Sequence, residues 1–241
     1  MIFLRKPKVL FLKAGKVGGT SFEIALSSFA RSDDIITPIS EEDEKLRLSR
    51  GYRGAQNYNY RISDFFDLSS KEILRCLFSR KIPEKFFNHI SAAEARRKLG
   101  EDLWSESLKV AIVRNPFDRL ISQYFWANRN RKNVPELSEW VRHNPMALFN
   151  NEQYFIDGKD VIDHYIRYDE LRLDMLTLEK LKPELRGLWS VFSGITTKNS
   201  IRPKSATVSN FFQKDERLRK SVEFFNEYFV MRFGYQEPGH E

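Results

Sequence analysis

Short apolar runs recur along the chain. Each is followed by a stretch in which apolar residues are spaced as on one face of a helix. The runs are KVLFL at 8–12, LKVAIV at 108–113 and the less apolar DHYIRY at 163–168. Continuous runs rich in Val, Ile and aromatic residues are typical of strands that a parallel sheet buries on both faces. We therefore predict three strands at these positions.

The helical stretches carry apolar residues three and four positions apart, which gives each helix one apolar face. Residues 22–29 show this spacing after the first strand, and Thr20 or Ser21 is the expected cap. Pro116 suits the first turn of a helix after the second strand. Further helices are predicted at 69–82, 90–100, 169–181 and 214–235. Strands alternating with helices predict an α/β fold with a central parallel sheet flanked by helices.

The size and composition of the chain predict one soluble domain over 1–241. Its 241 residues are 41% hydrophobic and include 20 Phe, enough for one substantial core. Residues 41–87 begin with a charged stretch and continue into a Gly, Tyr and Asn-rich loop at 51–60. We expect this region to project from the sheet as an insertion or acceptor-side region.

The net charge and the cysteine content indicate which class of partner and which cellular compartment to expect. The formal net charge of +7 favours an anionic partner, but no run of five Lys or Arg suggests a nucleic-acid arm. Cys76 is the only cysteine, which excludes an intramolecular disulfide and a cysteine-based zinc site and fits a reducing compartment. Residues 1–15 are too interrupted by Lys and Arg for a secretory signal or a membrane span. A cytoplasmic protein is expected, with a trimmed luminal domain as the alternative.

The stretch KVGGTS between the first strand and its helix predicts an anion site. A glycine-rich turn at a helix N-terminus presents unpaired backbone N–H groups at the positive end of the helix dipole. Gly18 and Gly19 let the backbone approach a ligand, Lys16 adds a positive charge, and Thr20 and Ser21 add hydroxyl donors. A plain strand-to-helix turn with a capping threonine is the alternative interpretation of this stretch alone.

The order of residues in this turn differs from that of the ATP- and GTP-binding P-loop. In the P-loop, the lysine follows the last glycine and precedes Ser or Thr, whereas Lys16 comes two positions before the glycine pair. The chain contains neither GKS nor GKT. A magnesium-dependent nucleotide triphosphatase is therefore disfavoured.

A second stretch, RNPFDRLISQY, follows the second strand. Arg114 lies at the end of the strand, and Ser122 lies about one and a half turns into the next helix. Both side chains can face the crevice outside the carboxyl ends of the strands, where a guanidinium and a hydroxyl suit a phosphate.

Together, the two stretches resemble the cofactor motifs of the sulfotransferase family, closest to the carbohydrate sulfotransferases of the heparan 2-O and chondroitin type. That family uses 3′-phosphoadenosine 5′-phosphosulfate (PAPS) as donor and releases adenosine 3′,5′-bisphosphate (PAP). The resemblance implies a P-loop-NTPase-like fold, a hydroxyl acceptor on a glycan, and no metal. The chain departs from the family at Ala14-Gly15, where Ile-Pro is usual, and at Val17, where Thr is common.

The resemblance also implies roles for individual residues. The 5′-phosphosulfate is expected to be surrounded by five residues of the first stretch: Lys16, Gly18, Gly19, Thr20 and Ser21. Arg114 and Ser122 are expected to bind the 3′-phosphate, and the loop of Ser200, Arg202 and Lys204 to cover the cofactor.

Catalytic roles follow from the same resemblance. Lys16 would stabilise the departing bisphosphate. His89 lies in NHISAAEARRKLG, which is similar to the histidine-bearing segment of the family, and it is the expected general base, with Glu94 as the fallback. A kinase-like nucleotide triphosphatase and a non-catalytic polyanion-binding protein remain alternatives.

Overall fold

The computed structural model describes residues 1–61, 64, 84–149, 152–195, 201–203, 205–213 and 215–235. The helix expected at 69–82, with Cys76, lies outside the described residues, as do Ser200 and Lys204. The expectations placed on them stay predictions.

A five-stranded sheet forms the centre of the fold, in the order β3-β1-β2-β4-β7. The three predicted strands are confirmed as β2 (Val9–Leu12), β4 (Leu108–Val113) and β7 (His164–Arg167), and they pair in parallel. Two short strands missed by sequence analysis, β1 (Ile2–Leu4) and β3 (Ile35–Ile36), extend one edge in antiparallel pairing. The sheet is therefore mixed, because only four residues connect β1 to β2 and a connection that short cannot cross back to a parallel strand.

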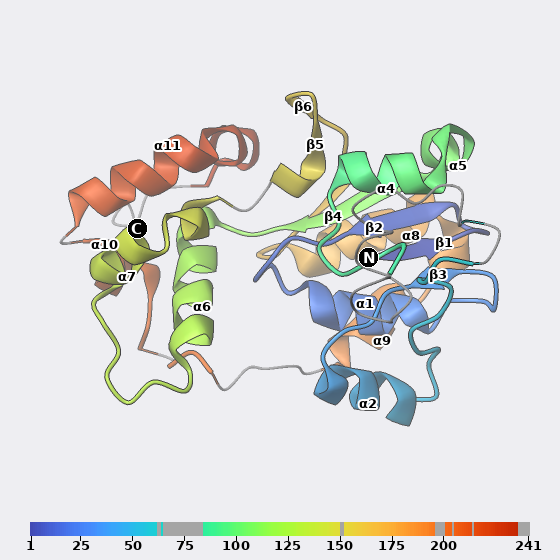
Figure 1. Cartoon of the computed structure of the whole chain (residues 1–241), viewed down its shortest axis with the longest axis horizontal. Coiled ribbons are helices and arrows are strands. Elements are labelled where there is room, and N and C mark those ends of the chain that lie inside the picture. The colour runs from blue at the N-terminus through green and yellow to red at the C-terminus, as the bar shows by residue number, and fades with distance from the viewer. Residues whose placement is uncertain are drawn as a thin grey trace.

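Helices cover the sheet on both faces (Figure 1). Helices α4 (Ala92–Leu99) and α5 (Glu101–Glu106) lie above it, whereas α1 (Gly19–Ser27) and α9 (Leu188–Ser193) lie below. Helix α8 (Leu171–Leu181) packs beside β7 and α9. The predicted α/β fold is confirmed, as are the predicted helices at 90–100 and 169–181.

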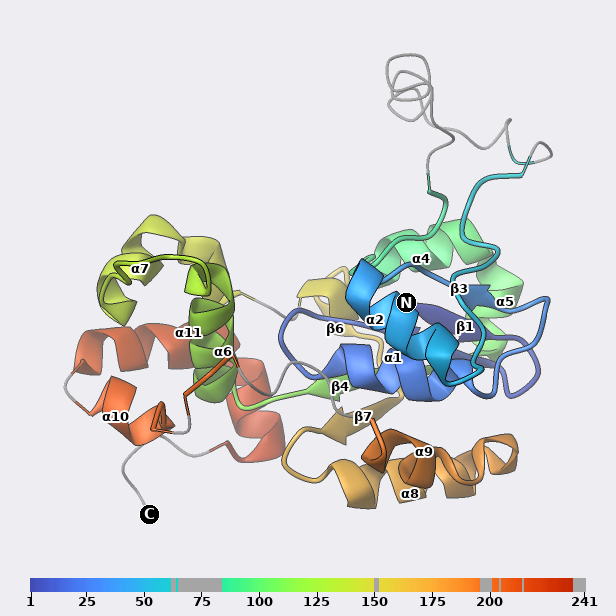
Figure 2. The same ribbon diagram turned by 90° about the horizontal axis from the view of Figure 1, so that it is seen from below.

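A second group of helices lies to one side of the sheet (Figures 1 and 2). Its members are α6 (Pro116–Asn128), α7 (Leu137–His143), the 3-10 turn η2 (Pro145–Leu148), α10 (Val208–Phe212) and α11 (Glu216–Phe233). These helices enclose a hydrophobic cluster distinct from the one around the sheet. The single domain expected over 1–241 stays a prediction.

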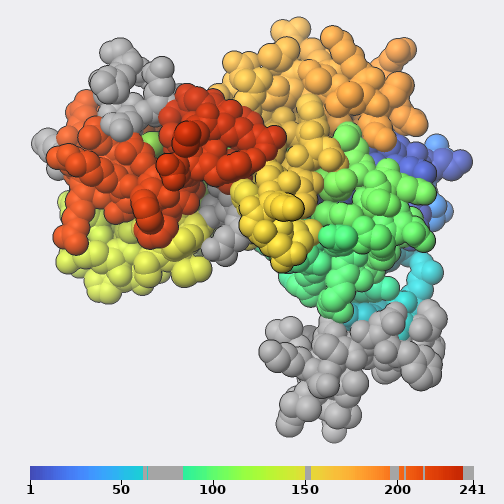
Figure 3. Space-filling model, turned by 90° about the horizontal axis from the view of Figure 1, so that it is seen from above, coloured from blue at the N-terminus to red at the C-terminus, as the bar shows by residue number. Residues whose placement is uncertain are grey.

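Helix α11 connects the two hydrophobic clusters. Val222 is buried in the helical cluster and Phe229 in the cluster around the sheet, and the helix kinks between them at Asn226. The buried Asn226 amide donates to the Leu148 carbonyl of η2 at 3.0 Å. Beyond the kink, α11 lies against the hairpin of β5 (Phe155–Ile156) and β6 (Lys159–Asp160), as Figure 3 shows.

Residues 41–56, the first part of region 41–87, lie against the sheet unit, and the projection expected of the whole region stays a prediction. Residues 41–49 form α2 (Glu41–Ser49), which packs against α1. The loop at 51–60 follows the sheet edge, because Gln56 and Ile36 exchange backbone hydrogen bonds of 2.9 and 3.0 Å. Arg47 is fully buried and Leu46 packs on the core, and this burial holds α2 to the sheet unit.

Candidate active site

A cavity of about 560 Å³ lies outside the carboxyl ends of the three parallel strands, between the sheet and the helical group. Segments that are far apart in the sequence line it: the turn after β2, the residue after β4, α6, and residues 202–207. Eight predicted site residues line this one cavity: Lys16, Gly18, Gly19, Thr20, His89, Arg114, Ser122 and Arg202. Ser21 lies in the first turn of α1 and is not among the lining residues.

The turn between β2 and α1 is held in a left-handed backbone conformation. Lys16 has a φ of 63° and Gly18 a φ of 82°, and Gly18 is the N-cap of α1. The prediction that Thr20 or Ser21 caps the helix is wrong, because the helix begins at Gly19 and both hydroxyl residues lie inside it.

The two glycines make room for side chains of the chain itself. A Cβ on Gly18 would lie 2.8 Å from the Tyr168 ring, and one on Gly19 would lie 2.8 Å from Cγ of Lys13. Neither contact follows from sequence spacing, since Tyr168 is 150 positions away from Gly18. The turn is thus packed against Tyr168 and Lys13 where it borders the cavity.

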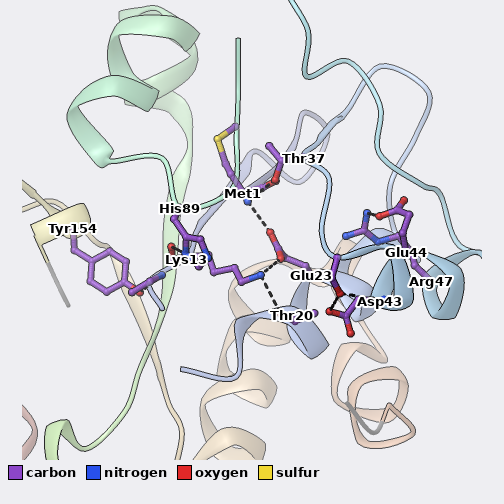
Figure 4. A network of polar contacts seen from close by, with 12 residues as sticks. Met1, Lys13, Thr20, Glu23, Thr37, Asp43, Glu44, Arg47, His89 and Tyr154 are labelled. Carbon is purple, nitrogen blue, oxygen red and sulfur yellow. Dashed lines mark hydrogen bonds and ion pairs between the residues drawn. The ribbon is translucent and has the colours of Figure 1, made fainter. Parts of the chain in front are cut away.

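A buried ion network lies beside the turn and α1 (Figure 4). Glu23 of α1 accepts from Nζ of Lys13 and from the α-amino group of Met1, each at 2.6 Å. Lys13 also donates to the Thr20 hydroxyl at 3.1 Å. Burial alone raises the pKa of Glu23, but the charges of Lys13 and the Met1 amino group outweigh burial and bring it to about 2. Sequence analysis missed Lys13 and Glu23, although both are charged residues within otherwise apolar stretches.

His89 lies beside this network and lines the cavity, where the residue is exposed. Its Nδ1 is 3.0 Å from the carbonyl oxygen of Lys13. Because a carbonyl only accepts, Nδ1 carries the proton and Nε2 carries the lone pair. Desolvation, followed by the positive charge of Lys13, lowers the pKa of His89 below its usual 6.5. The neutral imidazole that a general base requires is therefore the favoured form.

Arg114 is held by three different groups. Its Nη1 donates to the backbone carbonyl of Lys16 at 3.1 Å, and its Nε donates to Asp118 at 2.5 Å. The guanidinium carbon lies 4.2 Å from the centroid of the Tyr168 ring. Its orientation is therefore fixed by the glycine turn, by α6 and by the residue after β7.

Asp118 connects the two arginines of the cavity. One carboxylate oxygen accepts from Arg114 and the other from Nη1 of Arg202, whose Nε also donates to the Ala206 carbonyl at 2.8 Å. Burial raises the pKa of Asp118, but the adjacent Arg114 and Arg202 outweigh burial and lower it. Sequence analysis missed Asp118, although its position four residues after Arg114 is a recognisable helical pair.

Trp126 and Glu94 differ in their position relative to the cavity. Trp126 lines the cavity, and Nζ of Lys16 lies 4.2 Å from its ring centroid. Glu94, the fallback base, is not a lining residue and pairs at 3.1 Å with the buried side chain of Lys98, also on α4.

The donor set suits a ligand with several negative charges. Four cationic side chains line the cavity, against one carboxylate, that of Asp43; the cations are Lys13, Lys16, Arg114 and Arg202. The volume lies within the roughly 300–1,000 Å³ of small-molecule sites. Within the described ranges, no group of three or more His, Cys, Asp or Glu could hold a metal ion. In the same part of the chain, every helix is too short or too polar to cross a membrane.

Comparison with known proteins gives one family. No curated protein and no solved structure matches the chain. The model of the sulfotransferase family matches residues 1–172, a span that contains both motifs, His89 and Tyr168 but ends before Arg202. Because this match covers more than half of the sequence, the chain belongs to the sulfotransferase family, which includes the carbohydrate sulfotransferases of the heparan 2-O type.

Proposed function

We propose that this protein transfers a sulfuryl group from PAPS to a hydroxyl group of a carbohydrate. The observation that carries the proposal is the single cavity where the two motifs meet, with Lys16 from one and Arg114 from the other. The family match supports the same reaction class. When bound, PAPS supplies the sulfuryl group, and the residues of the chain position the reactants and stabilise charge.

The cavity offers two anion-binding ends. At one end, Lys16 and the backbone N–H groups at the start of α1 suit the 5′-phosphosulfate. At the other end, Arg114, Ser122 and Arg202 suit the 3′-phosphate. Ser21 stays a predicted 5′-side contact through its position in the first turn of α1.

Lys16 is proposed to act on the leaving group. Sulfuryl transfer resembles phosphoryl transfer, since the attacking and leaving oxygens are in line and the enzyme mainly positions groups and stabilises charge. The S–O bond to the 5′-phosphate breaks as the acceptor oxygen bonds to sulfur, and negative charge develops on the leaving oxygen. A lysine ammonium close to that oxygen stabilises the charge.

His89 is proposed as the general base. Its Nδ1–H donates to the Lys13 carbonyl, so Nε2 is the nitrogen able to accept the proton of the acceptor hydroxyl. That proton transfer generates the nucleophilic oxygen, and the imidazolium then experiences the positive charge of Lys13. Its lowered pKa favours later release of the proton to solvent.

The donor is tested by ligand stabilisation. PAP should raise the melting temperature of the full chain, because a ligand at 100 times its Kd stabilises the folded state by about 2.7 kcal/mol. ATP with magnesium serves as the comparison ligand. Stabilisation by ATP with magnesium and none by PAP would replace this proposal with a kinase-like nucleotide triphosphatase.

The acceptor is tested by transfer of radiolabelled sulfate. Glycans, lipids and small alcohols are each incubated with labelled PAPS and the protein, and the products are separated by class. Labelled glycan is the expected result. PAP binding without transfer to any class would instead favour a non-catalytic polyanion-binding protein, and transfer only to lipids or small alcohols would contradict a carbohydrate acceptor.

A further inference from the structure

Trp126 contacts two cations at the edge of the cavity. Nζ of Lys16 and the guanidinium carbon of Arg129 each lie 4.2 Å from the centroid of its indole ring. Arg129 is fixed locally, since its Nη1 donates to the Trp126 carbonyl at 2.7 Å. Trp126 lies four residues after Ser122 on α6, so both lie on the helix face that borders the cavity.

Lys16 is a residue whose side chain needs an external partner to fix its direction. Its stem has four rotatable bonds, and an unrestrained ammonium samples many positions. Its backbone is fixed already, by the left-handed φ of 63° and by the bond from Arg114 to its carbonyl. A cation above an indole ring is attracted to the negative face of the ring, and tryptophan gives the strongest such contact.

We propose that Trp126 is a positioning residue that holds the Lys16 ammonium in the donor-binding cavity. This inference rests on the proposed function, because Lys16 is the group it serves. The segment 114–126 then acts on the first motif at two points: Arg114 fixes the Lys16 backbone, and Trp126 fixes the Lys16 side chain. An aromatic ring that lines a cavity can instead stack on an acceptor sugar, and the two roles predict different kinetics.

The experiment is a double-mutant cycle on the full chain. The variants are Trp126→Leu, Trp126→Phe, Lys16→Met and the double variant Lys16→Met with Trp126→Leu. Phe224→Leu is the matched control, since Phe224 is an aromatic residue of α11 with 74% exposure and does not line the cavity. The measurements are kcat, KM for PAPS and for the acceptor, and PAP affinity by calorimetry.

Trp126→Leu should lower kcat about tenfold, as expected when a partly desolvated cation–π contact is removed. Trp126→Phe should lower kcat less than Trp126→Leu does, because a phenyl ring keeps part of the cation–π attraction. In the Lys16→Met background, Trp126→Leu should have no further effect on kcat or on PAP affinity. Phe224→Leu should match the parent.

Two outcomes would overturn the inference. One is that Trp126→Leu lowers kcat by the same factor in the Lys16→Met background as in the parent protein. The other is a rise in acceptor KM alone, which would assign Trp126 to the acceptor. Failure of the parent protein to bind PAP would instead refute the proposed function, and this inference with it, so the two failures are distinguishable.

Discussion

Arg114 donates a 3.1 Å hydrogen bond from Nη1 to the backbone carbonyl of Lys16. The two residues are 98 positions apart and belong to different motifs. The guanidinium therefore has a structural contact with the turn besides its proposed phosphate contact. Losing Arg114 should alter the geometry of Lys16 as well as the affinity for the nucleotide.

Arg114→Lys should lower both PAP affinity and kcat, each by more than tenfold. A lysine ammonium keeps the charge but cannot reach Lys16, Asp118 and a phosphate together from one planar group. Calorimetry and steady-state kinetics measure the two effects. Arg96→Lys is the control, because Arg96 forms an exposed pair with Glu101 on the surface. An Arg114→Lys variant with normal kcat would show that the bond to Lys16 has no catalytic consequence.

Lys16→Met should reduce kcat much more than it reduces PAP affinity. The ammonium is needed most where charge develops on the leaving oxygen, and its contribution to ground-state binding is shared with three other cations. A loss of about a hundredfold to a thousandfold in kcat is expected for one such charge-stabilising group. Lys220→Met, at an exposed position of α11, is the control. Equal losses in kcat and affinity would argue against a role specific to the transition state.

The rate should fall as the pH is lowered, with an apparent pKa below 6.5. Only neutral His89 can accept a proton, and desolvation lowers its pKa below 6.5, so the active form persists to lower pH than for a solvated histidine. His89→Gln should abolish this acidic limb together with most of the activity. If the residual activity of His89→Gln still falls in the same way at low pH, another group is responsible for that pH dependence.

Glu23→Gln should destabilise the protein by about 3–5 kcal/mol, because it leaves buried cations without their carboxylate. The pKa of Glu23 is about 2 in the folded protein, below its usual 4.5. This contribution is therefore fully present above pH 4.5 and is lost as the pH falls toward 2. Denaturant unfolding of both proteins at pH 7 and at lower pH measures it. Glu216→Gln, which breaks an exposed pair with Lys220, should change stability little.

Gly18→Ala should lower PAP affinity, whereas Gly187→Ala should lower only stability. Both glycines are N-caps in the left-handed region, with φ of 82° and 93°, so an alanine costs about 1–2 kcal/mol of backbone strain at either position. Only at Gly18 does the added Cβ meet a side chain, the Tyr168 ring. Displacing Tyr168 removes the ring that packs on Arg114. Thermal melts and calorimetry separate the two effects, and equal PAP affinities would refute the link through Tyr168.

The central strands and the helices around them could be predicted because each has enough residues to show a period. Leu108 to Val113 gives six consecutive positions, and the structure begins and ends β4 at the same residues. Strand β3 has two residues, which is too short for any pattern. The cap of α1 was mispredicted because Thr20 is a good capping residue, whereas Gly18 serves as the N-cap, two residues before Thr20.

The motif residues of the candidate site could be predicted from the sequence, but the residues that hold them in place could not. Lys16 and Arg114 stand in recognisable local patterns. The contact of Tyr168 with Gly18 and the pairing of Lys13 with Glu23 depend on how distant segments pack, and no local spacing encodes such packing.

Asp118 lies between two guanidinium groups that bind the same carboxylate from different segments of the chain. Two like charges at one end of a small cavity repel each other, and a chain without a fixed counterion must overcome that repulsion each time a nucleotide leaves. Asp118 supplies this counterion, so both arginines are oriented before any nucleotide binds. We expect an incoming phosphate to share Arg114 and Arg202 with this carboxylate, which would weaken its binding and favour its release.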